Sequence, residues 1–478
     1  MNPFLLLAFF VSTAFAAAPP PLVPPSEDEF YQAPARFEDE EIGTILKIRS
    51  PPRDLRSIYL PINIKNAWQI MVRSSDSFGQ PNYIVTTIME PYNADPGKVL
   101  SYQTFQDSAD IDCSPSYGML QGAPMSTLAT QIDMTFVVLA LQSGYYVVSP
   151  DYEGPKSTFA VGRQSGYATL DSIRATLHSG NFTGISNDAK VAMWGYSGGS
   201  VASGWAASLQ SRYAPELKEN LIGVALGGLV ANITAVAEAV DNGLFSGLIP
   251  VALHGLANEY PHLKDLMDIY VDPAQADALD YAAHQCLFGA VLNYVAAPIL
   301  KGKSPMFPGG VELLQHPQIA EILHENCLVC MNETYVPEMP VFVYHGTLDQ
   351  VIPIKDVRNI YKNWCDWGIE SLEFTEGVLG THITETLVGA PAAWTWLERR
   401  FAGEEPVRGC QHDARLQNFF YPNASSTTLD YFTGLFDAFM YGELGAELVS
   451  NEAGEAAGAG AGGNITSIVN KLRKKSES

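Results

Sequence analysis

The residues with the clearest chemical potential surround Ser197, in the run Gly195-Tyr196-Ser197-Gly198-Gly199. An apolar segment, residues 191–194, precedes this Gly-x-Ser-x-Gly pattern, and a helix-compatible stretch of small residues follows it. A strand that turns sharply into a helix presents a serine hydroxyl above the sheet, with the N–H of the next residue facing a developing oxyanion. The same pattern also fits a Gly- and Ser-rich turn before a core helix. The chemical interpretation therefore needs partners elsewhere in the chain.

Candidates for both partners, an aspartate and a histidine, occur later in the chain. A serine hydroxyl becomes a nucleophile when a histidine accepts its proton and a carboxylate orients the histidine. Asp349 lies in the loop after the apolar run 340–344, and His382 ends the loop after the next strand candidate, 372–374. Ser, Asp and His in this order, each at the end of a strand, are typical of α/β-hydrolases. We predict a triad of Ser197, Asp349 and His382.

The other histidines fit the role of base less well. His345 lies almost on a strand and is expected to be a core or supporting residue. His178 precedes the serine, and His412 is expected beyond the last element of the sheet. The remaining histidines fall in a helix-rich segment: His254, His262, His284, His316 and His324.

Acyl transfer also needs a second donor to stabilise the oxyanion. The N–H of Gly198 is the first donor, by its place after the serine. The polar loop Phe105-Gln106-Asp107 follows an earlier strand candidate and occupies the usual position of the second donor. The residue types alone do not choose among the three.

The surrounding pattern predicts the elements that must position these residues. Alternating or continuous apolar runs predict strands at 68–73, 83–89, 99–102, 145–149, 191–194, 221–225, 340–344 and 372–374. Helical spacing predicts helices at 125–141 and 168–178, and one amphipathic helix that follows His382 and runs to Phe401. Strands that alternate with helices indicate an α/β fold, with a mainly parallel sheet flanked by helices.

Between about residues 235 and 331, an apolar, helix-rich segment replaces the alternation of strands and helices. This segment predicts a lid or cap over the site. The alternative is a helical subdomain packed elsewhere. The expected organisation is a signal peptide (1–16), a Pro-rich lead-in (17–29), a first core part (30–234), a helical lid or cap (235–331), a second core part with a C-terminal flap (332–445) and a Gly/Ala-rich flexible tail (446–478). Cleavage of the signal peptide is expected after Ala16.

Composition narrows the class of protein. The 478 residues are 47% hydrophobic and 17% charged, which is typical of a globular protein with a large core. The formal charge of −24 argues against nucleic acid or an anionic membrane as a partner. No segment after the N-terminal one has the roughly 18 uninterrupted apolar residues that suggest stable membrane insertion. We expect a secreted, extracellular protein.

The cysteines and sequons agree with secretion. Cysteines at 113, 286, 327, 330, 365 and 410 suggest disulfides, whose pairing the spacing leaves open. Cys327 and Cys330 have a C-x-x-C spacing that also occurs in redox and zinc sites, but a local disulfide fits a secreted chain better. N-glycosylation sequons begin at Asn181, Asn232, Asn332, Asn423 and Asn464, and those that are used must lie at the surface.

With these residues placed, the chain resembles the fungal secretory lipase family, typified by the yeast lipase A enzymes. The similarity runs from about Phe30 to Cys410. The matching stretches are Ser101-Tyr102-Gln103 through Asp107, Asp112-Cys113-Ser114-Pro115-Ser116-Tyr117, Gly144-Tyr145-Tyr146-Val147-Val148-Ser149, Asp151-x-Glu153-Gly154, the segment around Ser197, and Tyr213-Ala214-Pro215-Glu216-Leu217.

The resemblance implies an α/β-hydrolase core with a helical lid and the triad Ser197, Asp349 and His382. It also implies an oxyanion hole formed by Asp107 and the N–H of Gly198. Disulfides Cys113–Cys286 and Cys365–Cys410 are implied as well, which leaves Cys327 and Cys330 for each other. That last pair and the Gly/Ala-rich tail depart from the family pattern.

The predicted function is that of a secreted triacylglycerol lipase, which hydrolyses acylglycerol esters through an acyl-enzyme. No metal or cofactor is called for, and the expected partners are a lipid or ester substrate and, transiently, a lipid–water interface. The alternative is a short-chain esterase or deacetylase acting on a small secreted or secondary metabolite. A non-catalytic binding protein would be expected to lack a triad residue, and the apolar insertion argues against a peptidase.

Overall fold

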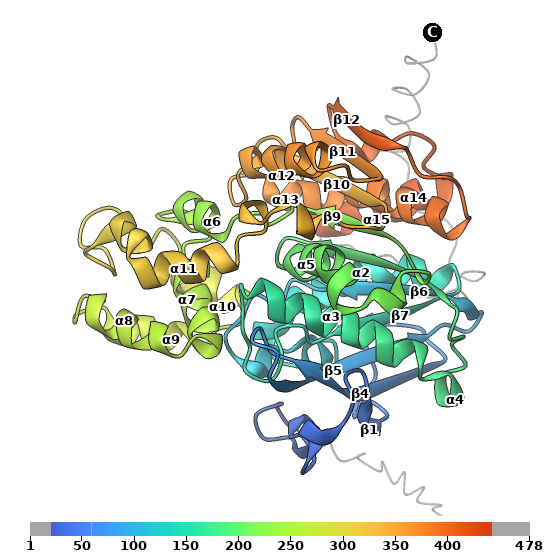
Figure 1. Ribbon diagram of the computed structural model, residues 1–478, viewed down its shortest axis with the longest axis horizontal. Helices are drawn as coiled ribbons and strands as arrows, with labels where there is room; N and C mark the ends of the chain where they lie inside the picture. The colour runs from blue at the N-terminus through green and yellow to red at the C-terminus, as the bar shows by residue number, and fades with distance from the viewer. Residues whose placement is uncertain (1–20, 59, 442–478) are drawn as a thin grey trace, which may run out of the picture.

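The protein is built around a ten-stranded, mostly parallel sheet (Figure 1). The structure, a computed structural model, describes residues 21–58 and 60–441. The expected signal peptide with its cleavage point at Ala16, residues 17–20 of the lead-in, the sequon at Asn464 and the tail at 446–478 lie outside the described residues.

The strand order places the predicted site strands within one parallel part of the sheet. In spatial order the strands are β1 (Ile45–Arg49), β4 (Asn66–Ser75), β5 (Pro81–Glu90), β7 (Tyr145–Pro150), β6 (Asp95–Gln103), β8 (Lys190–Tyr196), β9 (Leu221–Gly227), β10 (Val341–Gly346), β11 (Ser371–Gly377) and β12 (Gly409–Arg415). All pairs from β7 to β12 are parallel, whereas β1, β4, β5 and β7 pair antiparallel. A separate two-stranded sheet joins β2 (Arg56–Ser57) and β3 (Leu60–Pro61).

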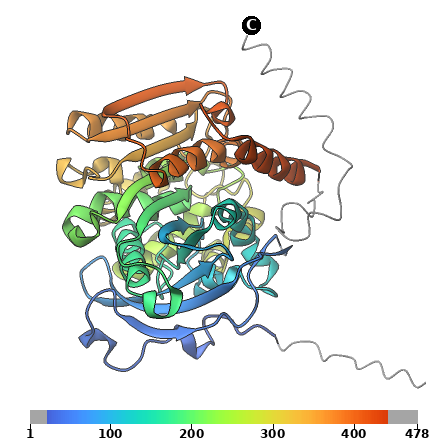
Figure 2. The same cartoon turned by 90° about the vertical axis from the view of Figure 1, so that its right-hand side faces the viewer.

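Helices cover both faces of this sheet because alternate residues of its strands are apolar on both sides. In β8, Val191 and Met193 pack into the core that contains α3 (Gly162–Leu177), α5 (Gly198–Tyr213) and α12 (Ile354–Asp366). Ala192 and Trp194 of the same strand face the core that contains α2 (Leu128–Gln142), α14 (Ala390–Phe401) and α15 (Ser426–Tyr441). Figure 2 shows α15, in dark red, along one flank of the molecule. The predicted α/β fold is confirmed.

A group of helices lies together beside the sheet, at the left of Figure 1. These helices are α6 (Ile233–Val240), α7 (Leu248–Glu259), α8 (His262–Tyr270), α9 (Ala276–Ala282), α10 (Leu287–Asn293) and α11 (Pro317–Glu325). Their apolar residues join the same core cluster as α3 and α5. The remaining α-helices of the described residues are α1 (Pro115–Gly118), α4 (Gly180–Thr183) and α13 (His382–Val388).

The prediction of one helix that follows His382 and runs to Phe401 is wrong, because α13 ends at Val388 and α14 begins at Ala390. Pro391, near the start of α14, has no N–H to continue a helix begun earlier. At the junction, a Cβ on Gly389 would lie 2.5 Å from Cδ2 of Tyr344, so only glycine fits between the two helices.

The expectation that His412 lies beyond the sheet is also wrong. His412 belongs to the edge strand β12, and its Nε2 lies 2.8 Å from Oε1 of Glu376 on β11. The strand reads Gly-Cys-Gln-His-Asp-Ala-Arg and is mostly exposed, so it lacks the apolar pattern by which strands are recognised.

The six cysteines form three disulfides, of which two join separate elements and one is local. Cys365–Cys410 joins α12 to β12, and Cys113–Cys286 joins the segment after β6 to the start of α10. Cys327–Cys330 closes a short turn after α11.

The sequons differ in exposure. Asn181, Asn332 and Asn423 are exposed. Asn232 is half-buried, and its side chain caps α6 by accepting hydrogen bonds from the N–H groups of Thr234 and Ala235.

Candidate active site

Ser197 occupies the sharp turn between β8 and α5. Its backbone has φ 52° and ψ −122°, a region that non-glycine residues rarely adopt. The turn packs directly on β6: a Cβ on Gly199 would lie 2.0 Å from the carbonyl oxygen of Gln103. The absence of a side chain at Gly199 is therefore what allows this close approach.

Ser197, His382 and Asp349 are brought together in one chain of contacts. Oγ of Ser197 lies 2.9 Å from Nε2 of His382. Nδ1 of the same ring lies 2.8 Å from Oδ2 of Asp349. Asp349 follows β10 and His382 begins α13 after β11, so the parallel strands deliver both to the end of the sheet that carries Ser197.

Asp349 is held in its charged form. Its Oδ1 accepts hydrogen bonds from the N–H groups of Val351 and Ile352, at 2.8 and 2.7 Å. Burial alone would raise the pKa of Asp349, but the hydrogen bond and charge of His382, followed by His345, bring this pKa below its ordinary value. An ionised carboxylate at this position stabilises an imidazolium on His382.

His345, near the end of β10, contacts the loop that carries Asp349. It is fully buried, and its Nε2 lies 3.0 Å from the carbonyl oxygen of Ile352 and 3.5 Å from Oδ2 of Asp349. Burial lowers the pKa of His345, which favours the neutral ring.

Three further residues that the sequence analysis did not single out hold His382 in place. The hydroxyl of Tyr196 donates to the backbone oxygen of His382 at 2.7 Å, and the N–H of His382 donates to Oε1 of Gln350 at 3.2 Å. Phe245 meets the imidazole edge-on, with ring centroids 6.3 Å apart. Tyr196 could have been noticed as part of the serine motif, whereas Phe245 comes from the helix-rich segment and carries no local signal.

Of the three residues in the predicted oxyanion loop, Asp107 is the one placed against the serine turn. A Cβ on Gly198 would lie 1.7 Å from Oδ1 of Asp107. Asp107 is 4% exposed, and burial raises its pKa to about 7, although the charge of His382 acts in the opposite direction. The N–H of Phe105, by contrast, donates to Asp133.

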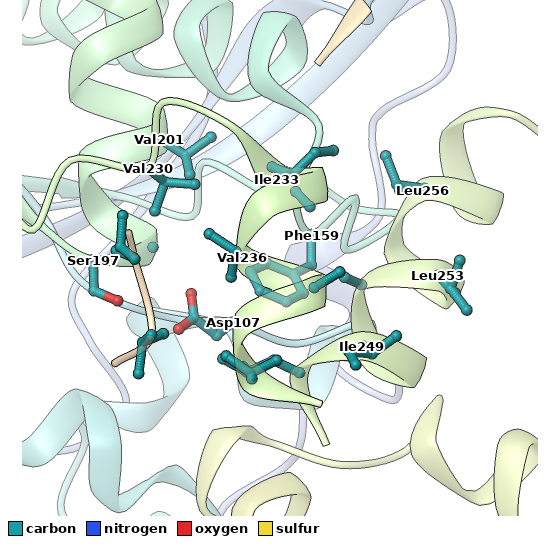
Figure 3. A pocket seen from close by; sticks show the side chains of 18 of the residues that line it. Asp107, Phe159, Ser197, Val201, Val230, Ile233, Val236, Ile249, Leu253 and Leu256 are labelled. Carbon is teal, nitrogen blue, oxygen red and sulfur yellow. The ribbon is translucent and has the colours of Figure 1, made fainter. Parts of the chain in front are cut away.

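Two apolar cavities meet at Ser197. The first, of about 750 Å³ including its open mouth, runs between α5, α6 and α7. Figure 3 shows Ser197 and Asp107 at one end of it and Leu253 and Leu256 at the other, with Val236 between them. The second, of about 1080 Å³ measured in the same way, is lined by His382 together with Tyr196, Phe245, Phe288, Ile383 and Leu387.

A mostly parallel sheet with a serine at a strand-to-helix turn, and with an acid and a histidine from two later strand ends, defines an α/β-hydrolase. Known proteins make the assignment more specific. A family model described as secretory lipase matches residues 119–409. Lipase 1 of Candida albicans is 57% identical over 442 residues, covering 92% of this chain and 94% of that relative.

More distant proteins agree. Lipase A of Arthroderma benhamiae is 36% identical over 439 residues, which cover 89% of this chain and 91% of the relative. The X-ray structure of Candida antarctica lipase A in its closed state superposes with a TM-score of 0.77 at 27% identity, covering 87% of this chain and 96% of that one. The chain belongs to the secretory lipase family. It is a lipase, a carboxylic ester hydrolase.

The buried acids beside the site predict how stability depends on pH. Burial raises the pKa of Asp107 to about 7 and that of Asp133 to about 8, whereas an unfolded chain titrates aspartate near 4. Between these values the unfolded state binds fewer protons, so the stability these groups contribute is complete below about pH 4 and is lost as pH rises to about 8. Calorimetric Tm values from pH 4 to 9 should fall over this interval.

Asp107→Asn and Asp133→Asn provide the controls, because the amide does not titrate. Each should flatten the decline in Tm by removing one titrating group. A decline that is unchanged in both variants would contradict the assignment.

Proposed function

We propose that the chain hydrolyses acylglycerol esters through an acyl-enzyme on Ser197. His382 takes the proton of the Ser197 hydroxyl as its oxygen attacks the carbonyl carbon, and the same Nε2 then protonates the departing alcohol. Water, deprotonated by His382, attacks the acyl-enzyme and releases the fatty acid. Asp349 stabilises the imidazolium in both steps. The observation that carries the proposal is the continuous chain of contacts from Ser197 through His382 to Asp349, at the junction of two apolar cavities.

We assign the oxyanion hole to the N–H of Gly198 and to Asp107. Charge builds on the carbonyl oxygen in the tetrahedral intermediate, and donors fixed in advance stabilise it. Below about pH 7 the buried Asp107 carboxyl group is protonated and can donate from its place against Gly198.

The two cavities suggest where each part of the ester binds. The leaving oxygen must lie near Nε2 of His382, and His382 lines the larger cavity but not the smaller. The alcohol part therefore belongs in the larger cavity and the acyl chain in the smaller. Apart from Ser197 and Asp107, the smaller cavity is lined by apolar and glycine residues, which suits a hydrocarbon chain.

We propose that residues 235–331 form a helical cap over the core. Helices α6 and α7 line the smaller cavity, and α10 lines the larger one. The cap thus supplies much of the apolar surface that a fatty substrate would contact. Residues 30–234 and 332–445 would then form the two parts of the core.

We also propose that the mature protein is extracellular. The family is described as secretory, and the N-terminal pattern, with cleavage after Ala16, is that of a signal peptide. Among residues 21–58 and 60–441, the structure has no helix of the length and apolar character needed to cross a membrane.

The triad and the substrate class are tested together. Ser197→Ala should lower kcat at least about 10⁴-fold, and Asp349→Asn about 10⁴-fold through loss of the imidazolium partner. Rates on triacylglycerols from triacetin to triolein should show hydrolysis of long acyl chains. Activity that survives Ser197→Ala would overturn the mechanism, and activity confined to acetyl esters would favour the short-chain esterase.

Val236→Trp tests the place of the acyl chain. Val236 lies on α6 inside the smaller cavity, so an indole there would fill the space for distal methylene groups (Figure 3). We expect at least about a tenfold loss of kcat/KM on long-chain esters, since several buried CH₂ contacts are lost, with little change on acetyl esters. Leu387→Trp, in the larger cavity, is the matched control and should leave the acyl-chain profile unchanged. The reverse pattern would place the acyl chain in the larger cavity.

A set of exposed apolar residues, here called the apolar rim, suggests contact with a lipid surface. It consists of Leu244, Leu348, Leu379 and Ile383, each about half exposed. Leu244 and Ile383 also line the larger cavity, and the Leu348 N–H bonds to the loop that carries Leu379. Because the protein carries a charge of −24, an uncharged lipid surface fits better than an anionic one.

Leu348→Asp combined with Leu379→Asp tests this contact, because neither side chain lines either cavity. Placing charges at the rim should lower the rate on emulsified triacylglycerol about tenfold or more, while the rate on a dissolved short-chain ester is retained. Ile269→Asp on α8 is the control, since Ile269 is 70% exposed and lines neither cavity. Equal losses on both substrates would contradict an interfacial role.

A further inference from the structure

The loop that carries Asp107 is held in an unusual conformation. Asp107 has φ 50°, in the left-handed region that non-glycine residues seldom adopt. This backbone brings its side chain against Gly198. Such a conformation persists only when the surrounding structure fixes it.

Two buried carboxyl groups from other elements face the backbone of this loop. Asp133 on α2 accepts a hydrogen bond from the N–H of Phe105 at 2.8 Å and another from the hydroxyl of Tyr102. Glu153, in the turn after β7, is 1% exposed and presents its carboxyl group to the N–H groups of Ser108 and Asp107. The two acids thus contact the loop on both sides of Gln106.

Glu153 differs from Asp133 in its hydrogen bonds. Among the described residues, neither of its oxygens has a partner in ordinary hydrogen-bond geometry. Burial raises the pKa of Glu153, and the neighbouring acids Asp107 and Asp151 raise it further. Burial of an incompletely satisfied carboxyl group is costly, and an apolar side chain of similar volume would fill the space with less penalty. A role in packing alone therefore does not account for a glutamate here.

We propose that Glu153 is a positioning residue for the oxyanion loop. Its carboxyl group attracts the N–H groups of Ser108 and Asp107 and keeps the backbone of Asp107 in the left-handed conformation that aims its side chain at the reacting carbonyl oxygen. Asp133 holds the other end of the same loop. The inference rests on the proposed role of Asp107 in the oxyanion hole.

Glu153→Leu distinguishes positioning from packing. The substitution keeps the volume and removes the acceptor. If Glu153 only fills space, the variant should be at least as stable and fully active. If it positions the loop, kcat on a dissolved short-chain ester should fall about tenfold or more, approaching the loss seen when an oxyanion donor is removed. KM should stay within about threefold, because the contact strengthens only in the transition state.

Two further variants complete the experiment. Glu153→Gln retains an acceptor oxygen and should restore kcat to within about threefold of the wild-type protein. Asp171→Asn is the matched control, because Asp171 is buried on α3 and bonded to Ser74, Arg174 and Tyr213. It should lower Tm without changing kcat.

The inference is overturned if Glu153→Leu keeps wild-type kcat, or if Glu153→Gln loses as much kcat as Glu153→Leu. If the leucine variant does not fold, Glu153→Met replaces it; failure of both to fold would assign the residue to folding and overturn the inference. Activity that persists in Ser197→Ala would instead overturn the proposed mechanism. If Ser197→Ala is inactive while Glu153→Leu is fully active, only the present inference fails.

Discussion

The close approach of the first turn of α5 to the end of β6 is the contact on which the site depends. Gly199 lies against the backbone of Gln103, and Gly198 lies against the side chain of Asp107, at distances that leave no room for a Cβ. This packing places the serine, the N–H of Gly198 and the Asp107 loop within one small volume. The parallel order of β8, β9, β10 and β11 then directs the Asp349 and His382 loops to the same end of the sheet.

The electrostatic environment differs between the two sides of Ser197. On the triad side, Asp349 has a cationic partner available in His382, and its pKa is lowered. On the oxyanion side, Asp107 and Asp133 are buried among other acids, and their pKa values are raised. In the proposed mechanism, one side would stabilise a positive imidazolium and the other would donate to a developing negative oxygen. Burial raises the pKa of the acids on both sides, but for Asp349 the hydrogen bond and charge of His382 outweigh it.

The helix-rich segment, which we propose to be a cap, would connect the chemistry to the substrate. Its helices form walls of both cavities, and its Phe245 also contacts the His382 ring. The same segment therefore contacts His382 and shapes the apolar walls of both cavities. Changes in these helices can alter both substrate fit and the orientation of His382.

The sequence by itself determined the α/β class and the positions of most sheet strands along the chain, and it singled out Ser197, Asp349 and His382 as candidates, because apolar periodicity and a short serine motif are local signals. Only the tertiary structure decided which loop residue faces Gly198, since that depends on the packing of α5 against β6. Glu153 belongs to a stretch that matches the family, but no local signal places it beside the Asp107 loop or places Phe245 beside His382. The strand β12 lacks the apolar pattern of a strand. Contacts between segments distant in the chain depend on the complete packing of the sheet and its helices, which residue spacing does not specify.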